Sequence, residues 1–268
     1  MRETAYAKVN LALHVRRRMP DGYHRIETVF AFCEDGDVLG VAQGEGLSLQ
    51  ITGPFASGLS AGEDNLVLRA ACALAEQAGI ASHARLSLDK RLPVAAGLGG
   101  GSADAAAALR LLNRWWRIGA DESALLAIAA GLGADVPACL ISRTARGEGR
   151  GDALQPLPDG TLSGTPLLLV NPGVPLSTAA VFRAWDGVDR GPLGDWRDGR
   201  NDLDAPARRL SPEIGDVLES LADASVARMS GSGATCFGLF ASDAERDAAA
   251  TAVSSDHPDW WVCQTRLR

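Results

Sequence analysis

Hydrophobic and polar residues alternate along residues 5–15, which predicts a strand. Every second residue is alanine, valine or leucine and points to one face. The opposite face carries Tyr6, Lys8, Asn10, Ala12 and His14. A Pro-Asp-Gly turn at residues 20–22 predicts a hairpin with a returning strand over residues 23–32. On that strand, the residues sharing one face are His24, Ile26, Thr28, Phe30 and Phe32.

The middle of the chain predicts short strands and then helices. Residues 35–60 are typical of two or three short strands joined by glycine-rich turns. An alanine-rich helix over residues 66–79 follows Asn65, which is a suitable N-cap, and a strand over residues 84–88 comes next. Asp121 is expected to cap a helix that runs to Ala130.

The C-terminal part predicts strands and helices in a mixed order. The expected elements are a strand at 167–170, a polar surface insert at 185–200, a helix after Asn201-Asp202, a helix at 211–222, a strand, glycine turn and strand over 226–240, a helix at 244–253 and a strand at 260–267. A charged, glycine-rich stretch at 145–152 begins a shift in composition that lasts to residue 164. We therefore expect two domains, residues 1–155 and 156–268.

Composition excludes several classes of protein. The 268 residues are 46% hydrophobic and 22% charged, as in ordinary globular proteins, and no apolar run approaches the roughly 20 residues that span a bilayer. The N-terminus lacks the apolar core of a signal peptide, so a cytoplasmic location and no membrane partner are expected. The net charge of −7 argues against nucleic acid as a partner. Five widely spaced cysteines without a C-x-x-C pair indicate reduced packing residues.

One stretch carries the strongest chemical signal. It consists of Pro93, Val94, Ala95, Ala96, Gly97, Leu98, Gly99, Gly100, Gly101, Ser102 and Ala103, and it leads into an alanine-rich helix expected over residues 104–113. Glycines let successive N–H groups converge on an anion, and a helix N-terminus behind them adds positive potential. The spacing fits neither G-x-x-x-x-G-K-[ST] nor G-x-G-x-x-G. A flexible linker would not normally lead into a helix, so a phosphate site is favoured. Lys8, Lys90 and Arg91 are the cations expected to add local positive potential.

Other candidate residues have simpler structural interpretations. A lysine on a polar strand face, such as Lys8, is usually only solvated. Asp135 precedes Val136-Pro137 and is well placed to be a helix N-cap. His24 stands at the end of a hairpin, and the glycines at 231–233 are typical of a hairpin turn. The residues alone leave these alternatives open.

The glycine stretch resembles the central P-x-x-x-G-L-G-x-[GS]-S-[SA] motif of the GHMP kinases, the galacto-, homoserine, mevalonate and phosphomevalonate kinases. Further blocks resemble the same family: A-K-V-N at 7–10, D-G-Y-H at 21–24, E-D-N-L at 63–66, G-A-D-V-P at 133–137 and the glycine turn at 231–233. The resemblance spans nearly the whole chain. It implies an α+β fold of two domains: an N-terminal domain similar to ribosomal protein S5, a C-terminal ferredoxin-like domain, and an active site in the cleft between them.

The resemblance also implies an ATP-dependent kinase with named roles for its residues. Lys8 and Asp135 are the expected catalytic pair, with Asp135 accepting the proton of the reacting hydroxyl. The glycine stretch would bind the triphosphate, Asn65 would lie near adenine, and Ser102 is the one expected ligand of Mg²⁺.

The blocks most resemble the family members that act on a cytidine diphosphate substrate. They imply transfer of the ATP γ-phosphoryl group to the 2-hydroxyl of 4-diphosphocytidyl-2-C-methyl-D-erythritol, in the non-mevalonate isoprenoid pathway. The implied substrate contacts are Asn10, Tyr23, His24, Phe30, Thr178 and Phe182. Asp152 departs from the glutamate usual in the family, which affects only local turn geometry. A monomer or weak homodimer is expected.

Two other functions stay open from the sequence. Another GHMP kinase with a small alcohol or amino-alcohol acceptor would not need a cytidine group. A nucleotide-binding regulator would share the glycine stretch but would have no need of both Lys8 and Asp135.

Overall fold

The computed structural model describes residues 1–158, 160 and 162–268, and the chain forms two compact units. The first consists of Met1–Ala7, Asp35–Val94 and Gly99–Ser142, and the second of Lys8–Glu34, Ala95–Leu98 and Arg143–Arg268. Strands β1 (Arg2–Arg18) and β2 (His24–Ala42) pair with each other, and each contributes residues to both units. Each unit is built from several separate segments of the chain. The domain boundary expected after residue 155 stays a prediction.

Strands β3 (Leu47–Thr52) and β4 (Ala84–Asp89) lie in the first unit. They pair in parallel, and β4 pairs antiparallel with the second half of β2, where Val38 lies opposite Asp89. The strand expected at 84–88 is thus confirmed. Between residues 35 and 60, however, only β3 is a new strand, because β2 continues without a break to Ala42.

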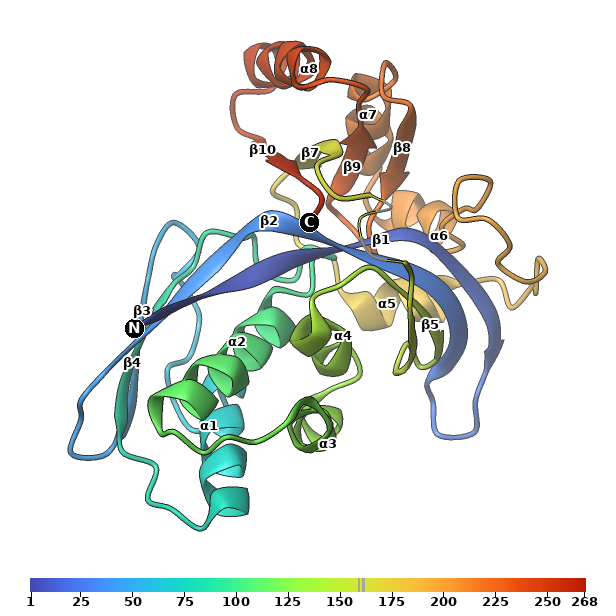
Figure 1. The fold of residues 1–268 in the computed structure, drawn as a ribbon. Coiled ribbons are helices and arrows are strands. Elements are labelled where there is room, and N and C mark those ends of the chain that lie inside the picture. The colour runs from blue at the N-terminus through green and yellow to red at the C-terminus, as the bar shows by residue number, and fades with distance from the viewer. Residues whose placement is uncertain (159, 161) are drawn as a thin grey trace. The chain divides into compact units, whose positions relative to one another are not determined.

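Four helices complete the first unit: α1 (Leu66–Ala78), α2 (Gly100–Trp115), α3 (Glu122–Leu132) and α4 (Val136–Ile141). The predicted caps of α1 and α3 are confirmed, since Asn65 accepts from the N–H of Val67 and Asp121 from that of Ala124. Helix α2 packs against the other three (Figure 1). Residues 105–109 of α2 have no exposed surface, because four alanines let neighbouring elements approach on every side. Helix α2 begins at Gly100 and not at the expected residue 104, so the end of the glycine stretch is helical.

The second unit adds strands that the sequence pattern did not predict. Strand β5 (Ala145–Gly149) pairs antiparallel with the first half of β2 and with β6 (Ala153–Pro156). The charged glycine-rich stretch is therefore a hairpin. Gly149 and Gly151 have φ of 73° and 96°, which suits the turn.

A four-stranded antiparallel sheet forms the C-terminal part of the second unit. Its strand order is β10-β7-β9-β8, where β7 is Pro166–Asn171, β8 is Val226–Met229, β9 is Cys236–Leu239 and β10 is Trp261–Arg266. The helices are α5 (Thr178–Ala184), α6 (Asp204–Leu210), α7 (Glu213–Ser220) and α8 (Asp243–Asp256). They follow β7 and β9 along the chain (Figure 1), which gives the expected ferredoxin-like arrangement. Helix α5 was not predicted, although Ser177 caps it.

The insert at 185–200 has no helix or strand, but it is not simply a surface loop. Trp185 and Trp196 are 4% and 7% exposed. Their backbone carbonyls accept hydrogen bonds from Arg18 and Arg228, at 3.3 and 2.6 Å. The two indoles and these arginines anchor the insert to the second unit.

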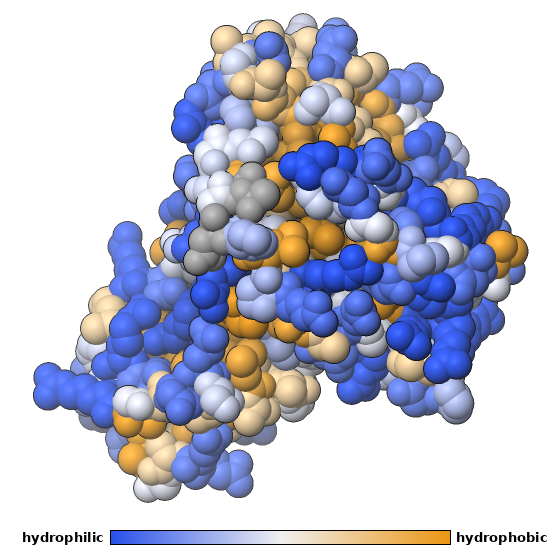
Figure 2. All heavy atoms as spheres, turned by 45° about the vertical axis from the view of Figure 1, so that its right-hand side comes forward, coloured by the Kyte–Doolittle hydropathy of each residue, from blue (hydrophilic) through white to orange (hydrophobic). Residues whose placement is uncertain are grey.

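The surface is mainly hydrophilic, as the composition of an ordinary globular protein leads one to expect. Large hydrophobic side chains seldom reach it, and hydrophilic residues predominate on the face drawn in Figure 2. Cys33, Cys139 and Cys236 are buried, as expected of packing residues. Among the described residues, no helix combines the length and hydropathy that a bilayer crossing requires.

Candidate active site

Left-handed backbone recurs at every second position from residue 95 to residue 99 of the glycine stretch. Ala95, Gly97 and Gly99 have φ of 53°, 78° and 64°. Alternation between right-handed and left-handed conformations turns successive N–H groups toward a common centre, which is the geometry of anion-binding nests. The backbone of this stretch therefore suits a phosphate.

Residues 95–98 are fixed to other parts of the second unit. The N–H of Lys8 donates to the carbonyl of Leu98 at 3.0 Å, and the N–H of Thr235 donates to that of Ala96 at 3.2 Å. The hydroxyl of Ser230 donates to the carbonyl of Gly97 at 2.9 Å. Strand β1, the glycine stretch and the turn between β8 and β9 thus meet at one place, as three of the motif blocks predict.

The remaining glycines form the N-terminus of α2 in the first unit. Gly99 is the N-cap, and no side chain of the described residues caps this end of the helix. The first N–H groups of a helix lack intrahelical partners and carry partial positive charge. A 16-residue helix that opens without a side-chain cap leaves this end suited to an anion.

Lys90 does not supply the positive potential expected of it. Its side chain is 3% exposed, and its ammonium forms ion pairs with Asp37 and with Asp104, the latter at 2.9 Å. Burial would lower the pKa of Lys90, but the two carboxylates outweigh it and the pKa is raised. Burial raises the pKa of Asp104 to about 7, against the opposing effect of Lys90. Arg91 is exposed and pairs with Asp89 at 2.7 Å.

Lys8 is buried and held by its neighbours on β1 and β2. Lys8 is 3% exposed, and its ammonium donates to Oδ1 of Asn10 at 2.8 Å and lies 4.7 Å from the centre of the Phe30 ring. An exposed lysine on a polar strand face was the simpler alternative, and the structure excludes it. A buried ammonium with a fixed acceptor is typical of a functional lysine.

Thr28 and Ser230 support this pair, and sequence reasoning gave neither a role. The Thr28 hydroxyl donates its one proton to the carbonyl of Ala12 at 2.6 Å, so it must accept from Nδ2 of Asn10 at 2.8 Å. This bond turns Oδ1 of Asn10 toward Lys8, which can only donate. Ser230 accepts from the N–H of Asn10 at 3.2 Å. Two features of the sequence could have pointed to these residues. Thr28 shares a strand face with His24, and Ser230 directly precedes the glycine turn.

Asp135 and Asn65 belong to the first unit, whereas Lys8 belongs to the second. Asp135 stands at the N-cap position of α4 with Pro137 in the first turn, but its side chain makes no capping bond. The structure thus bears out the position of Asp135 at the start of this helix, and the pairing of Asp135 with Lys8 stays a prediction. Asn65 uses Oδ1 for the cap of α1 and Nδ2 for the carbonyl of Ser60, at 2.9 and 2.7 Å.

His24 packs against two aromatic rings of the second unit. Its ring centre is 4.9 Å from that of Phe182 and 5.7 Å from that of Trp185. Burial, and then the charge of Arg18, lower the pKa of His24, which favours neutral imidazole. Its Nε2 is buried without a hydrogen-bond partner among the described residues. The structure thus brings His24 and Phe182 together as predicted, and the insert contributes Trp185.

The other expected substrate residues have different environments. Tyr23 is 52% exposed, and the Arg150 guanidinium lies 5.0 Å from its ring centre. Thr178 shares a hydrogen bond with Ser232 of the glycine turn at 2.8 Å. Phe30 is only 1% exposed, because Lys8 and Gly147 cover its ring. We therefore correct its expected role: Phe30 packs under Lys8 and offers no free face to a base.

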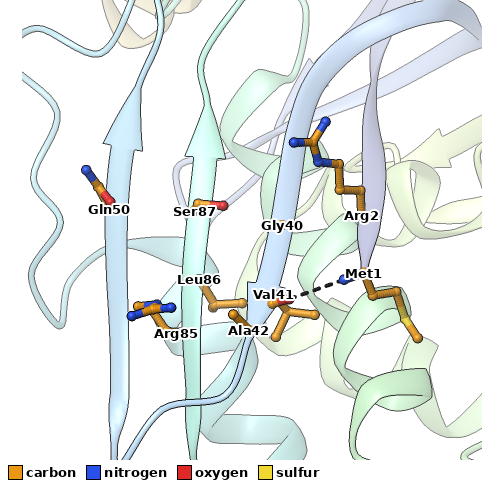
Figure 3. Close-up of a pocket in the computed structure, with 9 residues that line it drawn as sticks. All are labelled: Met1, Arg2, Gly40, Val41, Ala42, Gln50, Arg85, Leu86 and Ser87. Carbon is orange, nitrogen blue, oxygen red and sulfur yellow. Dashed lines mark hydrogen bonds between the residues drawn. The ribbon is translucent and has the colours of Figure 1, made fainter.

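A shallow pocket of about 280 Å³ lies elsewhere, in the first unit, where β1, β2 and β4 run side by side (Figure 3). Its lining residues are Met1, Arg2, Gly40, Val41, Ala42, Gln50, Arg85, Leu86 and Ser87. At its edge, the N-terminal amine of Met1 donates to the carbonyl of Val41 at 3.3 Å. None of the predicted site residues lines this pocket.

Comparisons with known proteins agree with the motif blocks. The model of the GHMP kinases N terminal domain matches residues 65–143, and that of the GHMP kinases C terminal domain matches residues 188–259. A protein of Rhizorhabdus wittichii named 4-diphosphocytidyl-2-C-methyl-D-erythritol kinase is 57% identical, over 99% of this chain and 94% of its own length. A protein of the same name from Sphingopyxis alaskensis is 48% identical over 100% and 99% of the two chains.

Solved structures show the same relationship. The crystal structure of a 4-(cytidine 5'-diphospho)-2C-methyl-D-erythritol kinase superposes with a TM-score of 0.82 at 35% identity, covering 99% of both chains. The homoserine kinase of Cytophaga hutchinsonii has a TM-score of 0.75 at 16% identity, covering 100% of this chain and 94% of that one, and shares the fold. With both family domains present and relatives about half identical over their full length, the chain belongs to the GHMP kinase family and is an ATP-dependent kinase.

Proposed function

We propose that this kinase transfers the γ-phosphoryl group of ATP to the 2-hydroxyl of 4-diphosphocytidyl-2-C-methyl-D-erythritol, a step of the non-mevalonate isoprenoid pathway. The proposal is supported by the names of full-length relatives at 57% and 48% identity. The observation that carries it in this chain is the buried Lys8–Asn10 pair, bonded through the Lys8 N–H to the glycine stretch.

The reaction forms one oxygen–phosphorus bond and breaks another. The 2-hydroxyl oxygen attacks the γ-phosphorus, the bond between this phosphorus and the β,γ-bridging oxygen breaks, and ADP leaves. The hydroxyl is tertiary and therefore crowded, so holding it in line with the leaving oxygen supplies much of the acceleration. Asp135 would accept its proton, and Lys8 would offset negative charge on the oxygens between the two reactants.

The triphosphate would lie along residues 93–103. Alternate left-handed residues at 95, 97 and 99 and the open N-terminus of α2 support this assignment. Asn65, at the start of α1, would lie near the adenine. Its amide is already bonded in the cap, so we expect the contact to come from its remaining hydrogen-bonding capacity.

Mg²⁺ would be held mainly by the phosphates. The described residues contain no group of three histidine, cysteine, aspartate or glutamate side chains that could hold a metal. Mg²⁺ commonly keeps several waters and binds through one or two protein oxygens plus substrate phosphates. The hydroxyl of Ser102, in the first turn of α2, fits such a ligand. The ion would neutralise charge on the transferred phosphoryl group.

The cytidine group would bind at the hairpin end and α5. Phe182 and Tyr23 would stack on the base, and neutral His24 can donate and accept hydrogen bonds at its edge. The unpartnered Nε2 of His24 supports this role. Asn10 and Thr178 would contact the remainder of the substrate.

We also place the enzyme in the cytoplasm, where ATP is available, as a monomer or weak homodimer. Its net charge of −7 gives nucleic acid no general attraction to it.

The direct test measures ADP formation with three acceptors: the cytidine substrate, homoserine and mevalonate. Phosphate transfer that requires the cytidine substrate supports the proposal, and ³¹P NMR of the product should show a new phosphomonoester. Transfer to homoserine or mevalonate alone would assign another activity within the family. ATP binding without transfer to any acceptor would favour a regulator.

A further inference from the structure

Lys90 connects the two ends of the glycine stretch. It stands three residues before Pro93, and its ammonium lies against the first turn of α2, where the stretch ends. One carboxylate comes from β2, at Asp37, and the other from α2, at Asp104. All of these residues belong to the first unit.

Asp37 binds the residues that directly precede the glycine stretch. Its Oδ2 accepts from the Lys90 ammonium, while its Oδ1 accepts from the backbone N–H groups of Arg91 and Leu92, at 2.6 and 2.8 Å. A single carboxylate therefore fixes the backbone immediately before the glycine stretch and the lysine side chain together. Asp37 has no exposed surface, so water does not compete for these bonds.

Asp104 and Gly100 contact Lys90 at the other end of the stretch, where α2 begins. Asp104 is 4% exposed, and its Oδ2 accepts from Lys90 at 2.9 Å. A Cβ added at Gly100 would stand 2.9 Å from Nζ of Lys90, so the ammonium packs directly against the first residue of α2. Oδ1 of Asp104 is buried without a partner among the described residues, which makes Lys90 its principal compensation.

The choice of lysine is itself informative. Lys8 and Lys90 are the only lysines in a sequence that otherwise uses arginine for its cations, and both are 3% exposed. A guanidinium is larger and planar, and it would not fit where a single methyl group at Gly100 would already be too close. Lys90 therefore occupies a place that requires a compact ammonium.

We propose that Lys90, clamped between Asp37 and Asp104, is a positioning residue that sets the geometry of the phosphate-binding glycine stretch. Its ammonium is enclosed by the two carboxylates, so this role needs no contact between the ammonium and the nucleotide. Lys90 fixes where the stretch begins and where α2 begins, and so aligns the N–H groups that would hold the triphosphate. The inference rests on the proposed phosphate role of residues 93–103. It predicts an effect on nucleotide affinity that does not depend on which acceptor is used.

The test compares Lys90→Met with Arg85→Met, which removes an exposed cation from β4 five residues earlier. Calorimetry with a non-hydrolysable ATP analogue should show at least about tenfold weaker binding for Lys90→Met, as is common when the groups supporting a binding site are lost, and no change for Arg85→Met. In kinetics, the KM for ATP should rise while kcat and the KM for the acceptor stay within about threefold.

A second variant keeps the inference testable if Lys90→Met does not fold. Asp37→Asn keeps the shape of the side chain and an acceptor for the N–H groups of Arg91 and Leu92, but it removes one of the two charges that hold the ammonium. We expect weaker binding of the ATP analogue by the folded variant. Unchanged affinity in either folded variant would overturn the positioning role. If the wild-type protein binds the analogue but transfers no phosphate to the cytidine substrate, the proposed acceptor is wrong. The positioning role of Lys90 is then still decided by the affinities of the variants for the analogue.

Discussion

The ammonium of Lys8 donates to the side-chain carbonyl of Asn10 at 2.8 Å, and both side chains are 3% exposed. The two residues project from the same face of β1, two positions apart. Asn10 is in turn oriented by Thr28 on β2. The direction of the ammonium therefore depends on Thr28 through Asn10.

Replacing Thr28 by valine tests this dependence. Valine keeps the shape but leaves Nδ2 of Asn10 and the carbonyl of Ala12 without their partner, which should cost about 1–3 kcal/mol of unfolding free energy. Asn10 can then rotate its amide, so we expect kcat to fall about tenfold because the catalytic ammonium is no longer held in one place. Denaturant unfolding and steady-state kinetics measure the two effects.

The matched control is Thr251→Val. That hydroxyl donates to the carbonyl of Asp247 on the exposed helix α8. Normal activity in both variants would mean that Thr28 does not orient Asn10.

His24 should make substrate binding sensitive to pH. Its pKa is lowered, by burial first and by Arg18 second, so the imidazole is neutral at pH 7 and becomes charged only as the pH falls through the lowered pKa. The charged ring loses its acceptor. The KM for the cytidine substrate should therefore be constant above the ordinary pKa of about 6.5 and rise on acidification below it.

The same pH series on His24→Gln provides the comparison. Glutamine keeps a donor and an acceptor but does not titrate, so its KM should be higher and show a smaller pH dependence. A wild-type KM that stays flat down to pH 5 would exclude His24 from the base site.

Two features require glycine at position 97: a close contact with Ser230 and a left-handed backbone. A Cβ there would lie 2.3 Å from the carbonyl oxygen of Ser230, and its φ is 78°. Gly119 has a similar φ of 71° but nothing within 4 Å of an added Cβ. We expect Gly119→Ala to cost about 1 kcal/mol from backbone strain alone, and Gly97→Ala to cost several times more.

Thermal unfolding of the two glycine variants gives the comparison, and ATP affinity should fall only in Gly97→Ala. Equal destabilisation of both would show that the contact with Ser230 relaxes easily.

Local sequence signals predicted most elements but not the surroundings of the site. The caps at Asn65 and Asp121 were correct because a cap depends on residues within one turn. Alternation along β1 suggested that Lys8 faces solvent, yet both faces of this strand are covered between residues 7 and 15. The second face is covered by Thr28 and Phe30 of β2 and by Ser230, which lies 220 residues from Asn10, and a local pattern cannot register such contacts.

The errors at Gly100 and Trp185 have similar causes. Glycine is a poor helix former, so propensity placed the start of α2 four residues late, whereas the helix already begins at Gly100, against the Lys90 ammonium. Trp185 was assigned to the surface because its neighbours are polar, but His24 and Arg18 of the β1–β2 hairpin bury it. Motif resemblance identified the family in spite of these errors, because it depends on residue spacing and not on burial.

The most direct test of the central claim is a double-mutant cycle on kcat with Lys8→Met, Asp135→Asn and the double variant, using the cytidine substrate. Each single change should lower kcat at least about 100-fold, within the range of lost acid–base catalysis, while affinity for the ATP analogue is retained. If the ammonium and the carboxylate act on the same transferred group, the double variant should be little slower than the worse single variant. A double variant whose loss equals the product of the two single losses, or full activity in either single variant, would contradict the account.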